Sequence, residues 1–95
     1  MYIVLLQYIK PLADIDALVP EHRAFLDRQY AAGHFLVSGA QVPRSGGVII
    51  VKSMPREALE TLLAEDPFQR ERVATYSIIE FTPSKAAPFL AELLG

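Results

Sequence analysis

The residues of this chain best suited to chemistry are a histidine and an aspartate that lie far apart in the sequence. His22 follows Leu18 by four residues and precedes Phe25 by three, so on a helix its imidazole lies on the apolar face. A buried imidazole with an unpaired N–H or lone pair costs about 1–3 kcal/mol. His22 is therefore either a structural core histidine with a polar partner or a residue that lines a cavity, and both interpretations stay open.

Asp66 is the second candidate, and it is followed by Pro67 and Phe68. Asp-Pro commonly begins a turn in which the carboxylate accepts backbone N–H bonds, which is the ordinary interpretation. The alternative is that the fold brings Asp66 to His22. A carboxylate bonded to one ring nitrogen would fix the tautomer of His22 and leave the other nitrogen for general acid–base catalysis.

Three further residues are candidates for binding a substrate: Ser38, Gly39 and Arg44. Ser38-Gly39 would let a ligand approach the backbone closely, although glycine in a strand more often marks a bulge. Arg44 is either a clamp for a carboxylate or a solvated loop arginine. Three strand tyrosines either reach the same cavity or simply pack: Tyr2, Tyr8 and Tyr76.

Composition excludes several other classes of function. The 95 residues include no cysteine, so disulfides and Cys-ligated metals are excluded, and two histidines without a carboxylate pattern predict no metal site. A net charge of −2 without a block of like charges argues against binding nucleic acid or a membrane surface. No apolar run reaches the roughly 20 residues that span a bilayer, and no phosphate-binding motif occurs. We expect a cytoplasmic protein that works without a cofactor.

The elements that must position these residues are four strands and three helices. Strands are predicted over residues 2–8, 34–40, 47–52 and 75–81. The regular part of the first helix is expected to begin at Pro20, after a looser turn at 14–19, and to end before Gly33. Ser53 is expected to cap a second helix, which Asp66-Pro67 stops. A last short helix is predicted over residues 84–94.

The order β-α-β-β-α-β predicts one α+β domain over residues 1–95 with a ferredoxin-like layout. In that layout both helices lie on one face of a four-stranded antiparallel sheet. The strands are nevertheless apolar on both faces, since Ile3 and Leu5 oppose Val4 and Leu6. The face without helices needs a cover, of which the C-terminal helix could supply part. We expect a homodimer that packs sheet on sheet.

Five segments then form an ordered pattern over nearly the whole chain, to about Pro83: Glu21–Leu26, Ala32–Gly39, Pro43–Ile49, Glu65–Phe68 and Tyr76–Phe81. This pattern resembles the YCII-related (YciI-like) family of the dimeric α+β barrel superfamily. The resemblance implies a ferredoxin-like fold whose sheets pack face to face in dimers. It also implies a cleft with a histidine and an aspartate as the active site, which by motif position are His22 and Asp66.

The chain departs from the family pattern at two places. Many relatives have Gly-Pro where this chain has Gly39-Ala40, and a glycine often stands where Arg72 stands here. The second departure is expected to put a charged side chain near the mouth of the cleft.

The resemblance further implies a chemistry, because one relative in chloroaromatic degradation is a dehydrochlorinase and the superfamily includes muconolactone isomerases. The leading hypothesis is a cofactor-independent lyase, isomerase or dehydrochlorinase-like enzyme for a small oxygenated organic acid. His22 would move a proton next to a carbonyl, and Asp66 would orient it. Ser38 or the Gly39 N–H would steady an oxyanion, and Arg44 would hold a carboxylate. The alternative is a non-catalytic ligand-binding or assembly module with a structural His22–Asp66 hydrogen bond.

Overall fold

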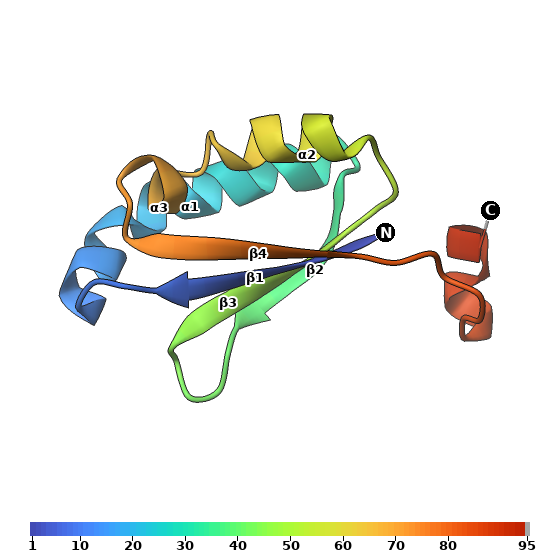
Figure 1. Cartoon of the computed structure of the whole chain (residues 1–95), viewed down its shortest axis with the longest axis horizontal. Helices are drawn as coiled ribbons and strands as arrows, with labels where there is room; N and C mark the ends of the chain where they lie inside the picture. Colours follow the sequence, from blue (N-terminus) through green and yellow to red (C-terminus); the bar gives the residue numbers. More distant parts are fainter. Residues whose placement is uncertain (95) are drawn as a thin grey trace.

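The computed structural model describes residues 1–94 and contains one four-stranded sheet. Its strands are β1 (Tyr2–Tyr8), β2 (Phe35–Ala40), β3 (Gly46–Val51) and β4 (Ala74–Glu80). They lie in the order β2-β3-β1-β4, and every neighbouring pair is antiparallel. The helices α1 (Leu12–Ala31), α2 (Arg56–Leu63) and α3 (Pro67–Arg70) lie on one face of this sheet (Figure 1). The predicted α+β, ferredoxin-like layout is confirmed.

The core fills the space between the sheet and the helices. On the central strand β1, Tyr2, Val4 and Leu6 point to the helices and are buried, whereas Ile3 and Leu5 point to the opposite face. The other buried apolar side chains that complete this core come from every other major element: Ile15, Phe25, Phe35, Ile49, Val51, Leu59, Leu62, Leu63, Phe68, Val73 and Ala74.

The first helix begins earlier than the sequence suggested. α1 starts at Leu12, so Pro20 lies in its interior and not in its first turn. Proline has no N–H, so the Asp16 carbonyl lacks its usual helical partner, and the burial of Ile15 and Phe25 on the same helix offsets that loss. At the other end the expectation holds, because Gly33 follows the helix with a φ of +80°.

Two further details of the helices differ from expectation. Ser53 does not cap α2, whose N-cap is Pro55; the Ser53 hydroxyl instead accepts a hydrogen bond from the amino group of Met1 at 3.2 Å. After α2 the chain forms an additional short helix, α3, with Asp66 as its N-cap and Pro67 at its first position. The connection from α2 to β4 therefore contains a capped short helix and is not a plain turn.

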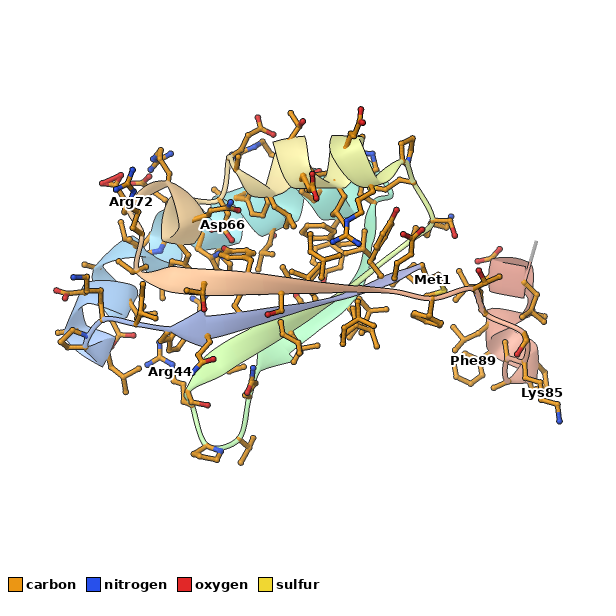
Figure 2. All side chains as sticks on the ribbon, viewed as in Figure 1. Met1, Arg44, Asp66, Arg72, Lys85 and Phe89 are labelled. Carbon is orange, nitrogen blue, oxygen red and sulfur yellow. The ribbon has the colours of Figure 1, made fainter. Side chains whose placement is uncertain are left out.

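The C-terminal segment leaves the body of the protein after β4. It ends in η1 (Pro88–Leu94), a 3-10 helix that is shorter than the helix predicted over residues 84–94. Lys85 and Phe89 lie beyond the end of the sheet (Figure 2), and Phe89 is 83% exposed. Because η1 buries none of its residues, it does not cover the second face of the sheet.

The second face of the sheet is apolar and carries none of the helices (Figure 1). Its apolar side chains come from all four strands and are half-buried or exposed: Ile3, Leu5, Val37, Val48, Ile50 and Ile79. We call this set the open sheet face. The same register also places the exposed polar residues Gln7, Thr75 and Ser77 on this face. No helix among residues 1–94 combines the length and the apolar character needed to cross a membrane.

Candidate active site

The fold brings His22 and Asp66 together, although 44 positions separate them in the sequence. The Nδ1 atom of His22, on α1, lies 2.8 Å from the Oδ1 atom of Asp66. Asp66 lies between α2 and α3 and is fully buried, while the side chain of His22 is 15% exposed. Contact between α1 and α3 places the two residues against each other.

Every bond that Asp66 makes is accepted by its carboxylate. Oδ1 accepts the backbone N–H of Phe68 at 3.0 Å as well as the His22 ring, and Oδ2 accepts the hydroxyl of Tyr76. An ionised carboxylate only accepts hydrogen bonds, so the proton of neutral His22 sits on Nδ1 and the lone pair on Nε2. Asp66 thus makes the contacts of both interpretations, since it caps a helix turn and also pairs with the histidine, while the catalytic use of the pair stays a prediction.

Tyr76 is a member of this site whose role the sequence left undecided. Burial raises the pKa of its phenol, and the negative charge of Asp66 raises that pKa further. The phenol therefore stays protonated and remains a donor to Asp66. The strand register indicates that Tyr76 belongs to the site. Tyr76 pairs with Leu6 and so points to the helix-covered face.

A cavity of about 670 Å³ opens between α1 and the sheet. His22, Leu26 and Phe68 line it together with Leu6 and Ile49 of the sheet, whereas Asp66 is not among its lining residues. Asp66 lies between the helices and the sheet (Figure 2). Its contact with Nδ1 places it behind the imidazole, on the side away from Nε2. Nε2 of His22 has no hydrogen-bond partner among residues 1–94, which leaves it available to a ligand.

The sequence-predicted residues of β2 also line the cavity. Ser38, Gly39 and Ala40 all contribute to its wall. The Ser38 hydroxyl is already hydrogen-bonded to the hydroxyl of Tyr30, at 2.6 Å. The irregularity of β2 lies between Phe35 and Val37, so Gly39 does not mark a bulge.

Arg44 lines the cavity from the loop between β2 and β3 (Figure 2). Its Nη2 atom lies 2.6 Å from Oδ1 of Asp16, and its guanidinium lies 6.0 Å from the centre of the Tyr8 ring. The hydrogen bond to Asp16 raises the pKa of Arg44. The loop closes at Gly46, where an added Cβ would lie 1.8 Å from the Leu6 carbonyl oxygen. Sequence reasoning missed Asp16 because it is an exposed helix residue whose partner lies 28 positions away in the sequence.

Arg72 and His34 lie outside the cavity. Arg72 is not among the lining residues, so it does not put a charge at the mouth. Its φ of +57° is the conformation that glycine adopts most readily, which accounts for the glycine of its relatives. His34 pairs through Nδ1 with Oε1 of Gln29 at 2.9 Å and is half-buried. Within residues 1–94 no group of His, Asp and Glu could hold a metal ion.

A ferredoxin-like domain with a buried aspartate behind a cavity-lining histidine is thus the class that fold and site define. The family model of the YCII-related domain matches residues 1–82, and the chain belongs to that family. A similar solved structure is 5-chloro-2-hydroxyhydroquinone dehydrochlorinase from Burkholderia phenoliruptrix AC1100, in complex with 2,5-dihydroxybenzoquinone. It is 15% identical with a TM-score of 0.71, over 85% of this chain and 93% of that one. No curated protein matches the sequence.

Proposed function

We propose that this protein is a cofactor-independent acid–base catalyst, of the lyase, isomerase or dehydrochlorinase type, for a small oxygenated organic acid. The observation that carries the proposal is the hydrogen bond between Nδ1 of His22 and the buried Asp66 carboxylate. That bond directs the basic Nε2 lone pair away from Asp66, on a residue that lines the cavity.

The proposed chemistry is a proton transfer at a carbon next to a carbonyl group. His22 takes the proton through Nε2, and the imidazolium that forms is stabilised by the carboxylate of Asp66. The backbone at Gly39 and the Ser38 hydroxyl, on the opposite wall, stabilise the negative charge that develops on the carbonyl oxygen. Return of the proton to the substrate completes an isomerisation. Loss of a leaving group such as chloride completes an elimination.

The test is exchange of carbon-bound hydrogen for deuterium in D₂O, followed by proton NMR on a panel of small unsaturated and chlorinated keto and hydroxy acids. Exchange needs only the proton-abstraction step, so it reports on the chemistry before the physiological substrate is known. His22→Gln is expected to lower the exchange rate at least about 100-fold, the usual contribution of a general base.

His34→Gln is the matched control. His34 is also hydrogen-bonded through Nδ1 but does not line the cavity, so its replacement should leave exchange unchanged. Equal exchange by the wild type and His22→Gln, or no exchange with any acid of the panel, would rule out the acid–base function.

A second candidate is a non-catalytic module that binds a small ligand in the same cavity. It is favoured by one observation, that Asp66 also caps α3 and so has a structural role independent of catalysis. In that case His22→Gln would keep ligand binding because the amide can still donate to Asp66. The exchange experiment separates the two candidates.

The open sheet face supports a further part of the proposal, that two copies of the chain form a dimer by packing these faces together. Its apolar side chains come from all four strands, and neither the helices nor η1 covers them. A cysteine-free chain also needs no oxidising compartment, and we place its activity in the cytoplasm.

A further inference from the structure

The cavity carries an uneven set of charges at its edge. Apart from His22, its charged lining residues are Asp16, Arg23 and Arg44. Two guanidinium groups therefore face one carboxylate, while the charge of Asp66 lies behind the imidazole and outside the lining. The cavity edge has an excess of one positive charge.

One of the two arginines is already neutralised. Arg44 is bound to Asp16 at 2.6 Å, in a pair whose side chains are 40% and 59% exposed. Asp16 already neutralises the charge of Arg44, and its carboxylate repels a ligand carboxylate that approaches the remaining N–H groups of the guanidinium. Arg44 therefore gives little net attraction to a second negative charge while Asp16 remains in place.

The other arginine has no such partner. Arg23 forms no hydrogen bond or ion pair with any of the residues 1–94, not even with Asp27 one helical turn later. It immediately follows His22 on α1, and both side chains line the cavity. A carboxylate bound to Arg23 would thus lie beside the imidazole without breaking an existing contact.

We propose that Arg23 anchors the single carboxylate of the ligand, and that the Asp16–Arg44 pair makes the cavity select monocarboxylates over dicarboxylates. The proposal names the substrate class of the site, and it rests on the proposed function only for the identity of the cavity. It gives Arg44 a role in selectivity where the sequence suggested a carboxylate clamp. It also assigns a binding role to Arg23, which lies in the Glu21–Leu26 segment of the family pattern but was given no role there.

The test is ligand binding without turnover, followed through the amide NMR signals of Gly39 and Gly47 in the cavity wall. The probes share one ring and differ in charge: neutral benzamide, benzoate with one carboxylate, and isophthalate and terephthalate with two at different separations. The proteins are the wild type, Arg23→Gln, Asp16→Asn and the control Arg28→Gln. Arg28 is an exposed arginine of α1 outside the cavity lining.

In the wild type, benzoate is expected to bind more tightly than benzamide and than either dicarboxylate. Arg23→Gln should weaken benzoate binding about tenfold, the effect of one charge-assisted hydrogen bond, and leave benzamide unchanged. Asp16→Asn should strengthen binding of at least one dicarboxylate about fivefold and change benzoate by less than about twofold. Arg28→Gln should match the wild type.

Three results would overturn the inference: benzoate binding unaffected by Arg23→Gln, equal gains for one and two carboxylates in Asp16→Asn, or no saturable binding by any probe. None of them decides the proposed function, which is tested by deuterium exchange and by His22→Gln. Conversely, selective benzoate binding that survives in His22→Gln would support the charge assignment even if no exchange occurred.

Discussion

The imidazole of His22 lies flat against the ring of Phe68, with ring centroids 4.0 Å apart and planes inclined by only 9°. The same short segment that supplies this ring also supplies Asp66. The stacking fixes the plane of the imidazole, while the hydrogen bond to Asp66 fixes its rotation within that plane. Two constraints from one segment thus hold His22 in a single orientation, as acid–base chemistry requires.

The stacking contact predicts how Phe68→Leu behaves. The smaller side chain leaves the fold intact but costs about 1–2 kcal/mol in the free energy of unfolding. The loss of the aromatic ring should also shift the His22 Cε1 proton strongly downfield, which NMR measures. Phe25→Leu is the control, because the Phe25 ring lies 6.5 Å from His22, so it should cost similar stability with a much smaller shift.

Asp66→Asn tests the tautomer of His22. The amide can donate as well as accept, so the requirement for a proton on Nδ1 disappears and the Nε2–H tautomer gains population. Loss of a charge-assisted network in the core should also cost about 2–3 kcal/mol of stability. Nitrogen-15 spectra of the imidazoles measure the change, and the His34 ring in the same sample should not respond. An unaltered His22 spectrum would contradict the assigned hydrogen bond.

Tyr76→Phe is expected to change the dependence of stability on pH. An unfolded tyrosine loses its proton near pH 10.0, but the raised pKa in the folded state keeps Tyr76 protonated. Above pH 10 the unfolded state therefore binds fewer protons, and stability falls with rising pH by up to about 1.4 kcal/mol per pH unit.

Removal of the Tyr76 hydroxyl removes the part of this dependence that Tyr76 contributes, while Tyr2, whose pKa burial also raises, keeps its own part. The change costs about 1–3 kcal/mol at neutral pH, because Asp66 loses a donor. Urea unfolding at pH 7, 10 and 11 measures both effects, with Tyr30→Phe as the exposed control. Parallel losses above pH 10 in Tyr76→Phe and the wild type would show that Tyr76 is not responsible.

The proposed dimer predicts the effect of charges on the open sheet face. Val37 and Ile79 are 57% and 47% exposed, so lysines at both positions should leave the monomer folded and abolish the dimer. Sedimentation equilibrium measures the change in mass. Val42→Lys, in the loop and not on the sheet, is the control and should remain dimeric. A monomeric wild type, or a dimer that survives both lysines, would contradict the proposal that this face forms the dimer.

Arg72→Gly is expected to stabilise the protein. Arginine at a φ of +57° carries a backbone strain that glycine does not, worth about 1 kcal/mol. The side chain does not line the cavity, so ligand affinity should stay the same. Thermal unfolding and benzoate binding, measured on the same sample, check the two halves of this prediction.

Periodicity was sufficient to predict the layout, because strand alternation and the spacing on α1 are local signals. The approach of Asp66 to His22 spans 44 positions; the residues themselves left it as one of two interpretations, and the resemblance to the YCII-related family implied it. The start of the first helix was predicted wrongly, because Pro20 was expected in a first turn. The helix in fact runs on both sides of Pro20, so its packing outweighs the low helix propensity of this one residue. The hydrogen-bond partners of a buried carboxylate depend on the tertiary structure. Tyr76 bonds to Asp66 across ten positions, and Arg44 bonds to Asp16 across 28, so no local pattern predicts either contact.

The close approach at Gly46 shapes how this protein can diverge over generations. Any side chain at that position would overlap the Leu6 carbonyl, so lineages that keep the fold inherit this glycine unchanged. Val42 to Ser45, at the tip of the same loop, are all exposed and free to vary. Related proteins can therefore differ at position 44, and with it in the ligand they accept, while the loop that positions this residue keeps its conformation at Gly46.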